Sequence, residues 1–263
     1  MGGAGRHGVT PEAMAAVFTA GVGAGAINSV VGSGTLITFP VLLATGLSPV
    51  TATVSNALGL IPGSISGAIG YRKELRGQRR RILKLGVGAL IGGLAGATLL
   101  LALPADAFET IVPVLVGLAL VLVALQPRIG RLVQRRRERT GNSPRRDGGP
   151  LLFTGLTLAS VYGGYFTAAQ GIIYLSLMGM LLDEPLQRLN GVKNVLSAVV
   201  NTVAALFFLF AADFDWTAVA LIAVGSALGG YLGAKVGRRF SPLVLRILVV
   251  AVGTVALVQL LLR

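Results

Sequence analysis

The chain has 263 residues, of which 54% are hydrophobic and only 13% are charged, and its mean hydropathy is +0.79. An ordinary soluble domain carries about a quarter of its residues as charged side chains. The sequence contains no cysteine and one histidine, His7, so it offers neither a disulfide framework nor a cysteine-ligated metal site. This composition excludes a soluble globular domain and indicates an all-α, polytopic membrane protein.

The basic residues are gathered in short blocks between long apolar stretches. The net charge is +13, from 23 basic and 10 acidic residues, and the basic blocks fall at 72–84, 128–146 and 235–246. Two other loops carry only acids, at 106–109 and 213–215. By the positive-inside rule the basic loops are expected in the cytoplasm, beside anionic lipid headgroups, and the acidic loops outside. A nucleic-acid partner is therefore not expected, and both termini are expected to be external.

Ten apolar segments are expected, five in each half of the chain. A membrane repeat at 1–126 is followed by a basic cytoplasmic linker at 127–150 and a second, inverted membrane repeat at 151–263. The first two segments of each half are short or rich in glycine, so each pair either crosses fully or forms a re-entrant hairpin. The ten segments lie near 12–30, 35–47, 51–71, 85–103, 110–126, 151–167, 169–182, 190–211, 216–235 and 243–262.

Two short motifs recur at nearly the same shift and indicate an internal duplication. The run GGLAGA at 92–97 returns as GGYLGA at 229–234, and VSNAL at 54–58 returns as VKNVL at 192–196. Basic and acidic loops exchange places under this shift, which requires the halves to be inserted upside down relative to each other. An inverted repeat with broken segments is typical of secondary transporters, whose site lies near the midplane.

Polar, glycine-rich interruptions at 28–35 and 162–171 are the main candidates for that site. Backbone that leaves the helix at membrane depth must line a wet cavity or be buried in protein, and a helix that restarts there points N–H groups at an anion. Asn56 and Asn194 lie on equivalent segments, and Lys193 directly precedes Asn194, so these three residues add polar side chains to the candidate site. The predicted substrate-binding residues are Asn28, Ser33, Gly34, Thr35, Asn56, Tyr165, Gln170, Lys193 and Asn194. Close helix packing by the glycines, interhelical hydrogen bonds by the asparagines and snorkelling of the Lys193 ammonium to the membrane surface remain the alternative interpretations.

All ten carboxylates fall in loops or at segment ends. Proton relays and Na⁺ sites commonly use acids within the membrane, so the sequence disfavours a cation substrate. Neither a carboxylate pair, a histidine dyad nor a metal cluster is available, so no enzyme activity, no metal and no cofactor is expected.

Five short motifs follow one another across both halves: Gly32-Ser33-Gly34-Thr35, Phe39-Pro40-Val41-Leu42, Gly46-Leu47-Ser48-Pro49, Tyr162-Gly163-Gly164-Tyr165-Phe166 and Leu189-Asn190-Gly191-Val192-Lys193-Asn194. In this order they resemble the TauE/SafE family of sulfite exporters. The resemblance implies a permease for small anions such as sulfite, sulfonates or sulfur-containing organic acids, with both interruptions near the permeation path. The sequence departs from the family's glycine-rich pattern at 167–169.

The leading hypothesis is a secondary transporter in the cell membrane that moves a small anion by alternating access. Two alternatives remain: the same fold with a cation or neutral cargo, and a membrane scaffold subunit that does not transport. The expected partners are the anion and membrane lipids, and a homo-oligomer remains open.

Overall fold

The computed structural model describes residues 10–140, 148–236 and 242–262, and all regular structure within these ranges is helical. The eleven helices are α1 (Pro11–Val30), α2 (Thr35–Ala44), α3 (Pro49–Gly59), α4 (Ile61–Gly70), α5 (Arg79–Ala102), α6 (Ala105–Thr140), α7 (Gly149–Phe166), α8 (Gln170–Leu181), α9 (Leu186–Phe208), α10 (Trp216–Val236) and α11 (Pro242–Leu261).

Local sequence explains where several helices begin. Thr10 and Ser48 are N-caps whose hydroxyls accept from backbone N–H groups three residues on, and a proline follows each at the first helical position. Asp215 plays the same role before α10, where its Oδ1 accepts from the N–H of Ala218 over 2.7 Å. Pro62 lies in the first turn of α4, two residues after Leu60, which separates α3 from α4.

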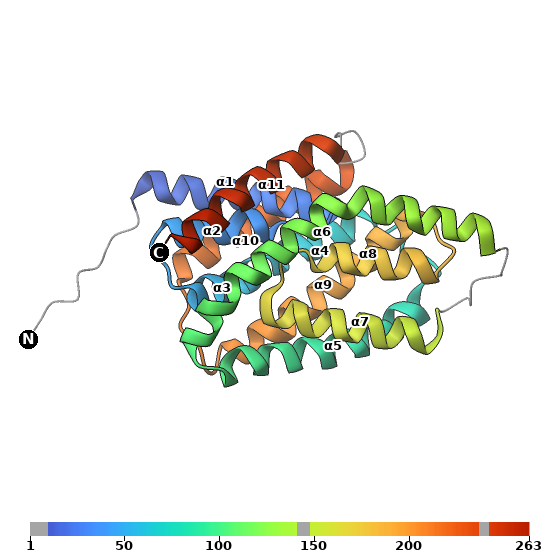
Figure 1. Ribbon diagram of the computed structural model, residues 1–263, viewed down its shortest axis with the longest axis horizontal. Coiled ribbons are helices and arrows are strands. Elements are labelled where there is room, and N and C mark those ends of the chain that lie inside the picture. The colour runs from blue at the N-terminus through green and yellow to red at the C-terminus, as the bar shows by residue number, and fades with distance from the viewer. Residues whose placement is uncertain (1–9, 141–147, 237–241, 263) are drawn as a thin grey trace, which may run out of the picture.

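The helices form a long bundle in which α1–α2 and α7–α8 are hairpins (Figure 1). The α1–α2 hairpin starts and ends at one end of the molecule, and the α7–α8 hairpin starts and ends at the other. The connections α2–α3, α5–α6 and α9–α10 lie at the first end, and α4–α5 and α8–α9 lie at the second. The basic turn at 71–78 and the acidic loop at 209–215 are therefore at opposite ends of the bundle.

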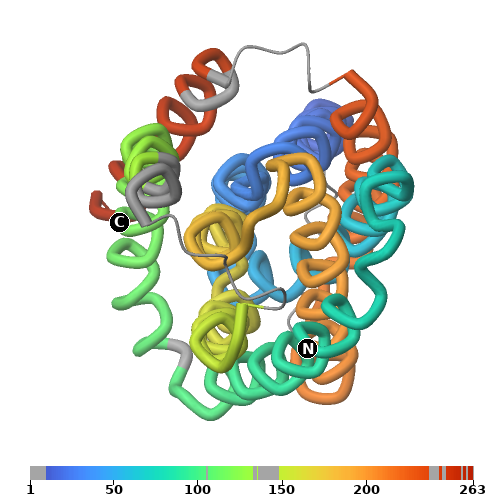
Figure 2. The backbone as a smooth tube through the Cα atoms, turned by 90° about the vertical axis from the view of Figure 1, so that its right-hand side faces the viewer, coloured from blue at the N-terminus to red at the C-terminus, as the bar shows by residue number. Residues whose placement is uncertain are grey.

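The short helices α2 and α8 occupy the interior of this bundle. Seen end-on, they lie between the α6–α11 pair and the remaining helices (Figure 2). Both are largely buried, with Leu36, Phe39 and Leu42 of α2 each at most 1% exposed. Large apolar side chains instead point outward from the long helices, as expected for a surface that meets lipid; examples are Val87, Ile91, Val114, Val121 and Ile247.

Two helix pairs pack closely because glycines remove side chains from the contact. A Cβ added at Gly92 of α5 would overlap the backbone of Thr157 in α7, and one added at Gly229 of α10 would overlap the backbone of Val22 in α1. Small residues let helix backbones approach in membranes, where dispersion contacts drive association. These close contacts agree with a packing role for the recurring glycine motifs.

Among the residues that the structure describes, five helices are long and apolar enough to cross a membrane, namely α1, α5, α6, α9 and α10. The protein is thus an all-helical, multi-pass membrane protein. The expected segments match helices in number except at 51–71, which is divided at Leu60 into α3 and α4. The fifth segment, expected to end at 126, continues as α6 to Thr140 through Pro127 and so covers the first part of the expected linker.

Candidate functional site

The tips of the two hairpins touch each other deep in the bundle. The backbone N–H of Gly171, at the start of α8, donates to the carbonyl of Gly32, between α1 and α2, over 3.1 Å. Gly32 has φ +89°, in the left-handed region that glycine adopts without strain. A Cβ on Gly171 would come within 2.5 Å of Gly32 Cα, so both positions require glycine for this approach.

A small polar cavity lies beside this contact. The volume open to the centre of a water-sized sphere is about 10 Å³, which is room for about one water molecule. An oxyanion is larger than this space. The cavity is lined by Asn28, Gly32, Ser64, Thr167, Gln170, Gly171, Asn194, Ser197 and Asn201.

Helix α9 supplies a stripe of polar side chains to this region. Asn190, Asn194, Ser197 and Asn201 follow one another at intervals of four, three and four residues, which places them on one face of a helix. Three of them line the cavity. Of these three residues, only Asn194 was predicted from the sequence. The helical spacing of Ser197 and Asn201 from Asn194 could have identified the other two.

Lys193 lies next to the cavity with its ammonium inside the protein. Its side chain is 1% exposed, and its Nζ donates to the carbonyl of Asn28 over 2.5 Å and to that of Ser29 over 3.1 Å. These carbonyls belong to the last turn of α1, where a helix presents free acceptors and the negative end of its dipole. Asn194 Nδ2 donates to the same Ser29 carbonyl over 3.1 Å. Lysine and asparagine together therefore join α9 to the end of α1.

Asn28 and Gly34 form a local cap at the first hairpin tip. The side-chain oxygen of Asn28 accepts from the N–H of Gly34 over 2.6 Å and thereby caps α2. In this conformation the N-terminal amide of α2 is occupied by the protein itself. Ser33 is 1% exposed, and its hydroxyl has no hydrogen-bond partner among the described residues.

Asn56 and Thr35 lie away from the cavity lining. The carboxamide of Asn56 accepts from Thr38 Oγ1 over 2.5 Å and donates to Thr35 Oγ1 over 3.2 Å, which fastens α3 to α2. Both Asn56 and Thr35 are buried, and neither is among the cavity-lining residues. The two asparagines of the repeated motif thus have different surroundings.

Gln170 and Tyr165 come from the second interruption, on either side of its break. Gln170 lines the cavity and its Nε2 donates to Tyr174 Oη over 2.7 Å. Tyr165 packs edge-on against Phe108 of α6, with 5.4 Å between ring centroids, and is outside the cavity lining. Between them Ala169 has φ +58°, in the left-handed region, and precedes α8 as its N-cap. This is where the sequence departs from the family's glycine-rich pattern.

The second end of the bundle is tied across the halves by an ion-pair cluster. Glu184, in the α8–α9 connection, pairs with Arg81 of α5 at 2.9 Å and with Arg188 of α9 at 2.7 Å. Burial opposes ionisation of Glu184, but its hydrogen bonds and charge pairing with the two arginines hold the pKa of its carboxyl below the ordinary value. The guanidinium of Arg188 also donates to the carbonyl of Arg76, at 3.4 Å.

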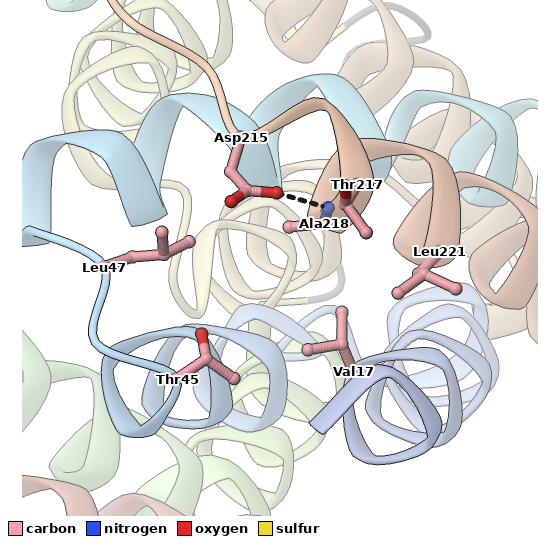
Figure 3. Close-up of a pocket in the computed structure, with 7 residues that line it drawn as sticks. All are labelled: Val17, Thr45, Leu47, Asp215, Thr217, Ala218 and Leu221. Carbon is pink, nitrogen blue, oxygen red and sulfur yellow. Dashed lines mark hydrogen bonds between the residues drawn. The ribbon is translucent and has the colours of Figure 1, made fainter. Parts of the chain in front are cut away.

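The opposite end carries a different, shallow pocket between the start of α10 and the α2–α3 connection (Figure 3). Asp215 is the one charged residue among those that line this pocket. Its backbone N–H and its carboxylate are both hydrogen-bonded to other groups of the protein. Its N–H donates to Ser55 Oγ over 3.0 Å, and its carboxylate caps α10. Because its polar groups serve the fold, this pocket is a weaker candidate than the central cavity.

Among the residues that the structure describes, no group of three His, Asp or Glu side chains converges to hold a metal. The polar groups at the centre are amides, hydroxyls, backbone groups and one ammonium. Such a set binds and orients a small polar ligand and provides no carboxylate or imidazole for proton transfer at the cavity wall.

An all-helical membrane protein with a polar cavity beside two helix breaks is consistent with the class of membrane transport proteins. The chain belongs to the sulfite exporter TauE/SafE family, whose model matches residues 17–260. It is 27% identical to the probable membrane transporter protein YfcA of Escherichia coli K12, over 96% of this chain and 91% of that one. It is also 27% identical to the probable membrane transporter protein ORF9 of a Sinorhizobium species, over 87% and 83% of the two chains. No solved structure matches the chain.

Proposed function

We propose that this protein is a secondary transporter that carries a small sulfur oxyanion, such as sulfite or a sulfonate, across the cell membrane by alternating access. One observation carries the proposal: the tips of two hairpins from opposite ends of the bundle meet beside a polar cavity bordered by the buried ammonium of Lys193. The family description, sulfite exporter, supplies the substrate class.

An inverted duplication accounts for the helix pairing. Helix α1 packs on α10 of the other half, and α7 packs on α5, so each hairpin's first helix contacts the fourth membrane segment of the opposite half. Likewise α4 contacts α10 while α9 contacts α5. Together with hairpins that enter from opposite ends, this supports two halves related by an axis in the membrane plane.

Alternating access then consists of movement of one half against the other around the hairpin tips. The ion pairs of Glu184 close the end that carries the basic turn at 71–78, which we assign to the cytoplasm. The cavity holds about one water molecule, so the described conformation has no room for an oxyanion. Opening toward either side would separate Gly32 from Gly171.

The chemistry of the cavity favours an anion. Lys193 brings one positive charge, and the lining residues include no carboxylate. Asn194 Nδ2 and the hydroxyls of Ser64 and Ser197 are donors suited to oxyanion oxygens. Of the nine residues expected from the sequence, we keep Asn28, Gln170, Lys193 and Asn194 as direct substrate contacts, and we assign Ser33, Gly34, Thr35, Asn56 and Tyr165 to the support of the two hairpins.

Flux in proteoliposomes tests the proposal. Purified protein is reconstituted, and the uptake of radiolabelled sulfite is compared with that of methanesulfonate and of a small carboxylate, acetate. We expect saturable sulfite or sulfonate flux that protein-free liposomes lack. Flux of Na⁺ or of a neutral metabolite without any sulfur anion flux would contradict the proposal and favour another cargo on this fold.

A further inference from the structure

The hydrogen-bond direction around Gln170 is fixed by a chain that ends on a backbone carbonyl. The hydroxyl of Ser160 donates to the carbonyl of Leu156 over 2.6 Å, and a carbonyl can only accept. The single hydrogen of Ser160 is thereby used. In the 2.6 Å contact between Ser160 Oγ and Tyr174 Oη, tyrosine must therefore be the donor.

The same argument orients the carboxamide of Gln170. Since Tyr174 gives its hydrogen to Ser160, its oxygen accepts from Gln170, and the group 2.7 Å away is Nε2. A reversed carboxamide would place two acceptors against each other. The oxygen Oε1 is therefore the end of the carboxamide that has no hydrogen-bond partner, on a residue that lines the cavity and is only 1% exposed.

Gln170 Oε1 accepts no hydrogen bond from the described residues, and the same is true of the side-chain oxygen of Asn201, another residue that lines the cavity. Gln170 Oε1 and Asn201 Oδ1 are both buried side-chain acceptors without a hydrogen bond, and Asn201 is 2% exposed. A buried acceptor without a partner is unfavourable, because it has lost its hydrogen bonds to water and gained none in the protein. A ligand that brings a donor to these oxygens restores a hydrogen bond, whereas a ligand with acceptors alone does not.

The cavity thus combines groups that attract a negative charge with groups that accept a hydrogen bond from a ligand. Lys193 and Asn194 provide the first, and Gln170 and Asn201 provide the second. A fully deprotonated dianion such as sulfite would place its oxygens against two unpaired acceptors. Hydrogensulfite carries one negative charge and one proton, so it meets the groups for negative charge and gives a donor to one of the two acceptors.

We propose that Gln170 and Asn201 are specificity-determining residues that accept hydrogen bonds from the substrate, so that the cavity selects a singly charged sulfur oxyanion carrying an O–H or N–H group. This inference rests on the proposed transport function. For sulfite, it assigns the hydrogensulfite ion as the species bound.

Sulfamate and methanesulfonate are a matched pair of probes. Both are stable monoanions of similar size, and they differ by an NH₂ group in place of CH₃. Their binding is measured as inhibition of labelled sulfite uptake and as the shift in thermal unfolding of the purified protein. We expect sulfamate to bind about tenfold or more tightly than methanesulfonate, since a buried acceptor left unpaired disfavours the analogue that lacks a donor.

Substitutions of Gln170 and Asn201 test whether these residues cause the preference for sulfamate over methanesulfonate. Gln170→Met and Asn201→Leu remove the acceptors, and each should bring the ratio of the two affinities close to one. Ser176→Ala is the control on the same helix α8, because Ser176 donates only to the carbonyl of Ile172 and is outside the cavity lining. It should keep the wild-type ratio.

The outcomes separate this inference from the transport function. Equal binding of the two probes by the wild-type protein, or tighter binding of methanesulfonate, overturns the inference while leaving anion transport in place, and this result does not depend on whether a variant folds. A preference for sulfamate that both substitutions leave unchanged also overturns it. If neither probe nor sulfite binds or moves, the inference and the proposed function fall together.

Discussion

The N–H of Gly171 donates to the carbonyl of Gly32 over 3.1 Å, and this bond joins the tips of two hairpins that enter the bundle from opposite ends. Each tip is a break between a long helix and a short one, so the N-termini of α2 and α8 both point toward the centre of the molecule. The positive ends of two helix dipoles and the ammonium of Lys193 therefore lie close to one another around the cavity. The carbonyls at the end of α1 balance this charge while no anion is bound.

Gly32→Ala should destabilise the protein strongly. The substitution forces an L-residue into φ +89° and makes its Cβ overlap Gly171, which together should cost about 3 kcal/mol or more. Gly46→Ala is a matched control, because Gly46 has φ +92° and nothing lies within 4 Å of an added Cβ. It should cost only about 1–2 kcal/mol. Equal losses in thermal unfolding would show that the tip contact contributes nothing.

Lys193→Met should weaken anion binding. Removing the only ammonium beside the cavity eliminates its attraction for negative charge, and the Kd for sulfite should rise at least about tenfold. The measurement is a titration of purified protein, with thermal unfolding used to verify that the variant is folded. Lys235→Met serves as control, since Lys235 is exposed and lies over the ring of Tyr231. An unchanged Kd in Lys193→Met would remove lysine from the site.

The two asparagines of the repeated motif should respond differently to truncation. Asn56→Ala breaks the bonds that fasten α3 to α2 and should lower the free energy of unfolding by about 1–3 kcal/mol. Asn194→Ala removes a donor at the cavity and should mainly raise the Kd for the anion. Paired measurements of stability and affinity check this, and identical profiles for the two variants would argue against their different positions.

The Glu184 cluster should make stability depend on pH. Because the arginines lower the folded-state pKa of Glu184, its contribution is present above the pKa of the unfolded chain and is lost as pH falls through the lower folded-state value. Glu184→Gln should cost about 1 kcal/mol or less at neutral pH and should flatten the acid side of the profile. Thermal unfolding measured from neutral to acidic pH checks this. A steeper acid limb in the variant would contradict it.

The positions of the helix breaks could be predicted from sequence, since the runs at 28–35 and 162–171 combine glycines with polar residues that hydrophobic helices otherwise avoid. The structure has its breaks within both runs, at 31–34 and 167–169. The break before Pro62 was missed because apolar residues surround it. The continuation of α6 beyond Pro127 to Thr140 was not predicted either, because a proline and a basic stretch are typical of a helix end.

Pairings between distant residues were beyond sequence reasoning. Lys193 was expected to meet an anion, but its contact with the Asn28 carbonyl depends on how α9 packs against the end of α1. Ser64 and Asn201 are each one of several polar residues in α4 and α9, and only the packing of these two helices brings both to one cavity. Asn56 and Asn194 occupy the same position of the repeated motif, yet Asn56 bonds to Thr38 of its own half and Asn194 bonds to Ser29 of the other half. A sequence repeat alone does not distinguish these two roles.

The opposite insertion of the two halves is the central claim, and cysteine labelling tests it most directly. The chain has no cysteine, so Lys73→Cys and Asp213→Cys each create a single reactive thiol at an exposed position in the α4–α5 and α9–α10 connections. In intact cells, a membrane-impermeant maleimide should label Asp213→Cys and reach Lys73→Cys only after the membrane is opened. Labelling of both positions from the same side would contradict the account.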